Sequence, residues 1–96
     1  MPWLQLQNEG KIMSDTTYNG WKNYDTWNVS LYLNNDEPLY RKAVGFMQDN
    51  PDKDNPYIGF ILGMYMTNMV TPDAVEYMSD KLDYPALNDM MRELVK

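Results

Sequence analysis

Apolar residues recur at intervals of three or four positions through much of the chain, the spacing typical of amphipathic helices. After Asn35 such residues fall on one helical face: Leu39, Tyr40, Ala43, Phe46 and Met47. Arg41, Lys42 and Gln48 point away from that face. The preceding residues 35–38 combine a cap residue, two acids and a proline, which is a typical helix start. The pattern therefore predicts a helix that ends before the polar loop 49–55.

The next segment, Tyr57 to Met69, is apolar on all sides and follows Pro56. In a water-soluble protein this pattern is typical of the most buried helix. Gly59 and Gly63 lie four positions apart, so we expect another helix to approach them closely. The C-terminal helix is the expected neighbour, and pairing of an exposed glycine face with a second copy of the chain is the alternative.

Two further helices are predicted near the C-terminus, one beginning at residues 71–73 and one after residues 83–85. Each start contains an Asp and a Pro, which suit the first turn of a helix. The inward positions are expected to be Val75, Met78 and Leu82 in the first, and Leu87, Met90, Met91 and Leu94 in the second.

Residues 24–33 fit two patterns. Trp27, Val29, Leu31 and Leu33 alternate with polar residues as in a strand, whereas Tyr24, Trp27 and Leu31 fit a helical face. A capping residue, Asn23, and a stop at residues 34–35 favour the helix. Before it, residues 18–21 (Tyr-Asn-Gly-Trp) predict a turn, because Asn and Gly tolerate positive φ.

The combined reading is an all-α fold, a compact bundle of four to five short helices with a loose N-terminal arm. We expect residues 1–17 to form this flexible arm and residues 18–96 to form a single helical domain. The alternative for the arm is a short clip made by Trp3, Leu4 and Leu6 against the body. The length of 96 residues suits one domain with one core.

Charge and composition exclude several classes of function. Fourteen acids against eight bases give a formal charge of −6, which repels phosphate backbones and disfavours direct nucleic-acid binding. The chain has no cysteine and no histidine, so disulfides, the usual zinc sites and imidazole chemistry are absent. The loop acids Asp49, Asp52 and Asp54 lack the Gly and distal Glu of a calcium loop. We therefore expect no metal and no cofactor.

No residues are assigned to catalysis. Ser14, Ser30 and Ser79 have no histidine to activate them, and no pair of acids is singled out by position. Six methionines, at 64, 66, 69, 78, 90 and 91, are expected to pack in the core, with an adaptable binding surface as the alternative. Trp27 is expected to anchor the core and Trp21 to cover its edge. The residues proposed for a protein interaction are Tyr18, Trp21, Tyr24 and Tyr32.

Residues 18–36 carry a specific resemblance. The run reads YNGWKNYDTWNVSLYLNND, and it resembles a family of short uncharacterised proteins of bacteriophages, including cyanophages, and some bacteria. Their shared pattern is approximately YNGWxNYxTWNV, followed by an apolar stretch that ends in Asn-Asp. The likeness fades beyond Tyr40. It implies a phage setting, and it implies no catalytic residues.

We therefore expect a small acidic, non-enzymatic binding protein, a phage accessory protein that modulates a host or defence protein with a basic face. The alternatives are a nucleic-acid mimic that inhibits a DNA-binding protein, and a small ligand-binding domain or enzyme. Residues 1–13 lack the features of a signal peptide, and the apolar segment 57–70 is shorter than the ~20 residues of a membrane span. We expect a monomer in the cytoplasm, that of the host if the protein is phage-encoded, with no membrane association.

Overall fold

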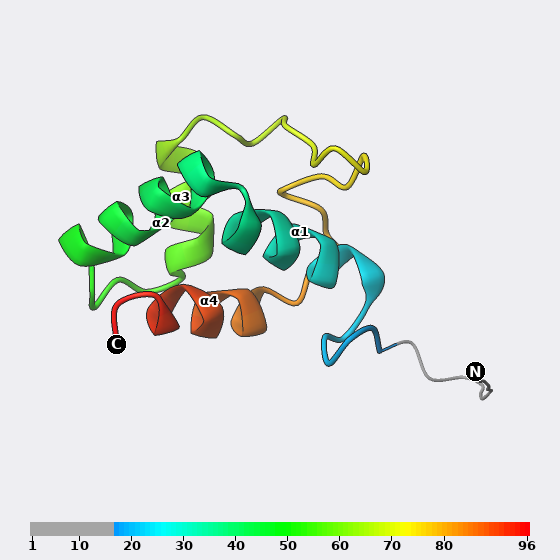
Figure 1. Cartoon of the computed structure of the whole chain (residues 1–96), viewed down its shortest axis with the longest axis horizontal. Coiled ribbons are helices and arrows are strands. Elements are labelled where there is room, and N and C mark those ends of the chain that lie inside the picture. The colour runs from blue at the N-terminus through cyan, green and yellow to red at the C-terminus, as the bar shows by residue number, and fades with distance from the viewer. Residues whose placement is uncertain (1–16) are drawn as a thin grey trace.

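A computed structural model describes residues 17–96, so the predicted arm lies outside the described part except for Thr17. The described chain forms four helices: α1 (Tyr24–Asn35), α2 (Glu37–Asp49), α3 (Pro56–Gly63) and α4 (Tyr84–Glu93). A connecting segment, residues 64–83, arches from the end of α3 to the start of α4 (Figure 1). The all-α bundle predicted from the sequence is confirmed.

Helix α1 resolves the two patterns of residues 24–33 in favour of a helix. The Asn23 side chain caps it by accepting a hydrogen bond from the Thr26 backbone N–H at 2.9 Å. Val29 and Leu33, one turn apart, are fully buried on its inner face. The helical face expected from the sequence is wrong, because Tyr24 is 40% exposed and Trp27 and Leu31 are only half-buried.

Asp36 joins α1 directly to α2. Its backbone N–H donates to the Tyr32 carbonyl at 3.0 Å, which ends α1, and its side chain accepts from the Leu39 N–H at 3.2 Å, which begins α2. Ala43 and Met47 are buried as predicted. The prediction for Tyr40 is wrong, because this side chain is 37% exposed on the outer side of α2.

Helix α3 is shorter than predicted, because it ends at Gly63 instead of Met69. The chain leaves the helix through two capping hydrogen bonds, from the Tyr65 N–H to the Leu62 carbonyl and from the Met66 N–H to the Ile61 carbonyl. This pair of bonds defines a Schellman motif. Burial all round is also wrong, since Leu62 is 53% exposed.

The helix predicted to start at residues 71–73 does not form. Residues 69–77 instead make a small turned-back loop, in which the Thr71 N–H donates to the Val75 carbonyl at 2.8 Å and the Tyr77 N–H donates to the Met69 carbonyl at 3.1 Å. Ala74 takes a left-handed conformation, with φ of 68°, which a helix does not allow. The inward positions were nevertheless predicted correctly, because Val75 and Leu82 are buried and Met78 is partly buried.

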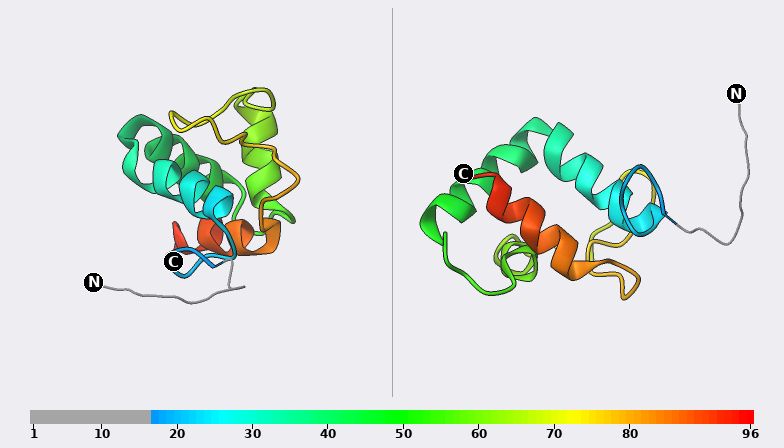
Figure 2. Two further views of the ribbon diagram at one scale, coloured as in Figure 1. Left: turned by 90° about the vertical axis from the view of Figure 1, so that its right-hand side faces the viewer. Right: turned by 90° about the horizontal axis from the view of Figure 1, so that it is seen from below.

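Helix α4 begins as predicted after Asp83, whose side chain accepts from the Ala86 N–H at 3.3 Å. It packs against α1, α2 and α3, and Figure 2 shows it lying between α3 and the connected pair α1–α2. The buried hydrophobic core consists of Val29, Leu33, Ala43, Met47, Tyr57, Phe60, Ile61, Met66, Val75, Tyr77, Leu82, Leu87 and Met91.

The predicted close helix crossing at Gly59 and Gly63 is wrong. A Cβ placed on Gly63 would meet no atom within 4 Å. A Cβ on Gly59 would meet the Lys53 side chain, at 2.6 Å from Cε, and the Phe46 ring at 3.3 Å. The nearest atoms to a Cβ on Gly59 thus belong to the loop before α3 and to α2, not to the expected C-terminal helix.

Within residues 17–96, every helix is too short or too polar to cross a lipid bilayer.

Candidate functional site

Three aromatic residues from the motif form one cluster at the start of α1. The ring of Tyr18 lies 4.6 Å from that of Trp27 and 5.3 Å from that of Tyr24, and the Tyr24 and Trp27 rings are 5.5 Å apart. A tight two-residue turn positions Tyr18, because Asn19 and Gly20 both have positive φ, of 48° and 88°. Tyr18 and Tyr24 are 41% and 40% exposed.

Trp27 is half-buried and belongs to this surface cluster, so the prediction that it anchors the core is wrong. Trp21 is the tryptophan that packs against the core, as expected for a residue at its edge. Of the four residues proposed for a protein interaction, the structure brings together Tyr18 and Tyr24. Trp21 is directed to the core, and Tyr32 lies farther along α1, where its hydroxyl donates to Asp73 at 3.1 Å.

A buried amide explains another position of the motif. Asn28 is fully buried on α1, and its Nδ2 donates to the Asp73 carboxylate at 2.7 Å and to the Tyr24 hydroxyl at 3.3 Å. Its Oδ1 accepts from the Thr71 hydroxyl at 2.6 Å. The amide group therefore uses both donors and its acceptor, as buried polar groups must.

Thr71 continues this network into the connecting segment. Its buried hydroxyl oxygen accepts from the backbone N–H groups of Asp73 and Val75, each at 3.2 Å. These bonds fold residues 71–75 into a turn where the sequence alone favours a helix. The motif residue Asn28 is therefore hydrogen-bonded to a segment more than forty positions away.

A second connection joins the motif to the end of the same segment. The Asn23 side chain donates to the Lys81 carbonyl at 2.8 Å, and the Thr26 hydroxyl accepts from the Asp83 N–H at 3.0 Å. Thr26 is fully buried and also donates to Asn23 at 2.7 Å. The cap of α1 is thus shared with the start of α4.

The phenols near Asp73 have raised pKa values. The hydrogen bond to the Asp73 carboxylate raises the pKa of Tyr32, and partial burial adds to the effect. Partial burial raises the pKa of Tyr24, with the negative charge of Asp73 as the next cause. Both phenols are therefore neutral near pH 7, where the Tyr32 hydroxyl donates to Asp73 and links α1 to the connecting segment.

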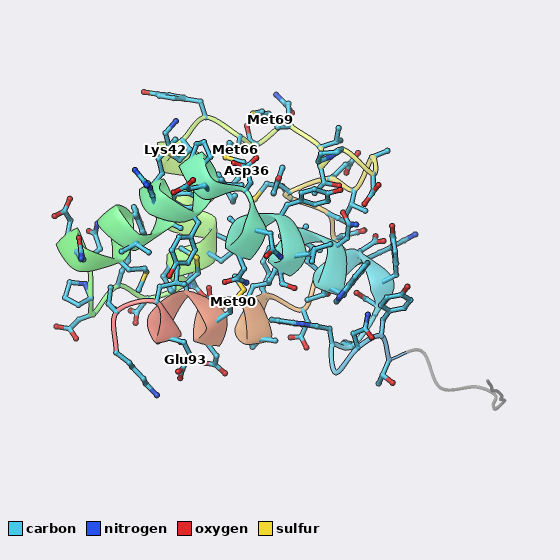
Figure 3. All side chains as sticks on the ribbon, viewed as in Figure 1. Asp36, Lys42, Met66, Met69, Met90 and Glu93 are labelled. Carbon is cyan, nitrogen blue, oxygen red and sulfur yellow. The ribbon has the colours of Figure 1, made fainter. Side chains whose placement is uncertain are left out.

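A different region contains a surface hollow that the sequence did not single out. This methionine groove, of about 390 Å³, lies between the start of α2 and the connecting segment. Its lining residues are Asp36, Pro38, Leu39, Lys42, Met64, Met66, Met69, Val70, Pro72 and Tyr77. Figure 3 shows Asp36, Lys42, Met66 and Met69 gathered on this side of the molecule, while Met90 and Glu93 lie on the side of α4.

Between residues 62 and 70, the stretch of chain that supplies much of the groove lining, four large apolar side chains are exposed. Leu62, Met69 and Val70 are 53%, 50% and 50% exposed, and Tyr65 is 89% exposed. Tyr65 has a φ of 57° at the position of the Schellman motif that glycine usually occupies. The side chain is thus presented to solvent from a strained but hydrogen-bonded backbone.

The methionines of the connecting region divide between the two expected roles. Met66 is buried and Met64 is partly buried, whereas Met69 is half exposed, and all three line the groove. Core packing is therefore confirmed for Met66, and Met64 packs against the core, as do Met78 and Met90, while Met91 lies within it. Only Met69 departs from that prediction. The sequence signal was the apolar run after Pro56, which exceeds what one short helix can bury.

No ion-binding cluster accompanies this surface. Within residues 17–96, no three acids lie close enough together to hold a metal ion.

No curated protein and no solved structure matches the chain. A family model described as "Family of unknown function (DUF7249)" matches residues 14–96, which includes the motif, all four helices and the connecting segment. The chain therefore belongs to this family of unknown function, DUF7249.

Proposed function

We propose that this chain is a small acidic, non-enzymatic binding protein that docks on a protein partner. The observation that carries the proposal is the exposed apolar series Leu62, Tyr65, Met69 and Val70, of which Met69 and Val70 line the methionine groove. Exposed apolar side chains at a surface hollow are typical of interaction surfaces. Tyr is also among the residues enriched at the energetic centres of interfaces.

The charge of the chain defines the expected partner. With a net charge of −6, the protein is attracted to a surface rich in lysine and arginine and repelled by phosphate backbones. The partner is therefore a protein with a basic face, and its association weakens as salt screens the charges.

The nucleic-acid-mimic alternative is not proposed, because many carboxylates serve the chain's own structure. Asp36 and Asp83 cap helices, and Asp73 holds the connecting segment. Three more acids pair with bases one turn away: Glu37 with Arg41, Asp89 with Arg92 and Glu93 with Lys96.

The biological setting comes from the resemblance of residues 18–36 to short phage proteins. On that basis the protein is a phage accessory protein that modulates a host or defence protein in the host cytoplasm. Its small size and exposed apolar surface suit an inhibitor or adaptor that works by occupying a surface of its target.

Affinity capture from phage-infected host cells tests this function. The full chain and two variants are compared: Tyr65→Ser together with Met69→Ser, which alters the exposed series, and Tyr40→Ser, which removes an exposed tyrosine outside the groove. We expect one or a few host proteins to be retained by the wild type and by Tyr40→Ser. The double variant and raised salt should release them, whereas retention that ignores both changes would contradict the proposal.

A further inference from the structure

We propose that the methionine groove binds a short basic–apolar segment of the partner protein, which inserts one large apolar side chain and places lysine or arginine beside it. This inference rests on the proposed function and specifies its site and ligand chemistry. The groove volume of about 390 Å³ falls within the range of roughly 300–1,000 Å³ for sites that enclose a bound group.

The walls of the groove suit an apolar anchor. One wall is the first turn of α2, with Pro38 and Leu39, and the opposite wall carries the thioethers of Met64, Met66 and Met69. Methionine side chains are flexible and polarisable, so they can adapt to anchors of different shape. The groove can therefore accept apolar anchors that differ in shape.

Tyr65 lies in the chain between two residues that line the groove, Met64 and Met66. An L-residue in the left-handed region has a conformational cost, and a side chain that is 89% exposed makes few contacts to offset it. The two Schellman hydrogen bonds nevertheless hold its backbone in place. Because the backbone is already held, binding needs to order only the two side-chain torsions of Tyr65, which favours its use as an anchor.

The charges near the groove select the kind of segment. Asp36 lines the groove. Glu76 is an exposed acid on the turned-back loop, whose residues Val70, Pro72 and Tyr77 also line the groove. Lys42 is the one base in the lining. These acids and the overall charge of −6 disfavour binding of a second copy of the chain, an anionic membrane or nucleic acid in the groove. It favours a protein segment with Lys or Arg next to its anchor.

Methyl NMR with ¹³C-labelled methionine tests the site directly. The probe is a short synthetic peptide in which Leu and Phe alternate with Lys and Arg, added to the full chain. We expect saturable shifts of the Met64, Met66 and Met69 methyls, while the fully buried Met47 and Met91 stay unchanged. A peptide with Glu in place of the bases, and one with Ser in place of Leu and Phe, should each bind at least about tenfold more weakly.

Variants separate anchor from charge. Tyr65→Ser should weaken peptide binding by at least about tenfold, and Tyr40→Ser should leave it unchanged. Glu76→Lys should weaken binding several-fold and flatten its salt dependence, because it reverses an exposed charge on the turned-back loop. The backbone of Glu76 is paired with Val70, and the substitution leaves that pairing in place. The folded methyl spectrum of each variant shows that lost binding is not lost folding.

The outcomes separate this inference from the proposed function. If lysate capture depends on Tyr65 and Met69 but the basic peptide leaves the groove methyls unmoved, the inference is overturned and the function stands. Equal binding of the charge-reversed peptide also overturns it. Concentration-dependent shifts of the same methyls without peptide would assign the groove to a second copy of the chain and overturn it as well.

Discussion

The motif region and the groove region use their side chains in opposite ways. Around Asn28 the polar groups are satisfied within the chain, by Thr71, Asp73 and Tyr24. Around the groove, Tyr65 and Met69 turn apolar surface to solvent. The polar residues of the motif thus serve internal geometry, while its aromatic residues Tyr18 and Tyr24 remain partly exposed. The motif residues Asn23, Thr26 and Asn28 therefore indicate a fold requirement before they indicate a binding site.

The largest expected effect tests the motif side of this comparison. Asn28→Ala removes three hydrogen bonds at once and leaves the buried Thr71 hydroxyl without its acceptor. We expect the free energy of unfolding to fall by about 3 kcal/mol, since each unsatisfied buried group costs roughly 1–3 kcal/mol. Urea unfolding measures this, with the exposed Asn68→Ala as the control that should remain near wild type.

The same variant also tests whether the motif supports the groove. If Asn28 holds residues 71–75 in place, its loss should shift the NMR methyl signals of Met66 and Met69, which line the groove. Stability within 1 kcal/mol of the wild type, together with unmoved methyl signals, would show that the network is dispensable and that the two regions are independent.

Trp27 gives the second largest effect and sharpens the distinction between cluster and core. Trp27→Ala should cost about 2 kcal/mol, because the half-buried ring loses its contacts with Tyr18 and Tyr24 but leaves no large internal cavity. The fully buried Phe60→Ala is the comparison and should cost about 4 kcal/mol. Thermal unfolding of both variants checks the order, and equal losses would return Trp27 to the core.

The helix starts and the turn at Thr71 show where prediction from sequence succeeds and where it fails. The helix starts at Asn23, Asp36 and Asp83 were predictable, because a cap is decided by a side chain and the backbone three residues away. The turn at Thr71 was not, because its conformation depends on Asn28 across the fold. Burial of Val75 was predicted despite the wrong conformation, since both the expected helix and the observed turn direct it inward.

The candidate site was less predictable than the fold, for a related reason. An apolar run such as 57–70 has the same sequence pattern whether its members are buried or exposed. The position at which α3 ends decides which of these residues are exposed. That position depends on Tyr65, which adopts a left-handed conformation unusual for its residue type. The aromatic residues of the motif were more conspicuous, and for that reason they were proposed for the interaction instead.

The alkaline side of the stability curve tests how the groove region is held. Burial raises the pKa of Tyr57, whose hydroxyl donates to the Tyr77 carbonyl at 2.5 Å on the connecting segment. The stabilisation is complete below the unfolded-state pKa of about 10 and is lost as pH rises above it, by about 1.4 kcal/mol per pH unit for each such tyrosine. Tyr57→Phe should flatten the curve above pH 10, and an unchanged slope would contradict this role.

A smaller effect of opposite sign is expected at Tyr65. Tyr65→Gly should raise the free energy of unfolding by about 1 kcal/mol, because glycine adopts the left-handed conformation without the steric cost of a side chain. Ala74→Gly is a matched control, with a φ of 68° and a position outside the groove lining. Both variants should gain stability, but only Tyr65→Gly should lose binding of the basic peptide. A loss of stability in Tyr65→Gly would show that its side chain serves the fold.

The smallest effect is expected at Gly63, at the end of α3. A Cβ at this position meets no atom within 4 Å, so a larger side chain there extends into solvent. Gly63→Leu should therefore change stability by less than about 0.5 kcal/mol, as surface substitutions usually do. A buried helix crossing would instead make the substitution cost about 1–3 kcal/mol through overpacking. Size measurement across a dilution series completes the test. A wild-type dimer that Gly63→Leu converts to a folded monomer would show that the surface at Gly63 pairs with a second copy of the chain. That surface includes the exposed Leu62 and lies just before Met64, which lines the groove that we assign to a partner.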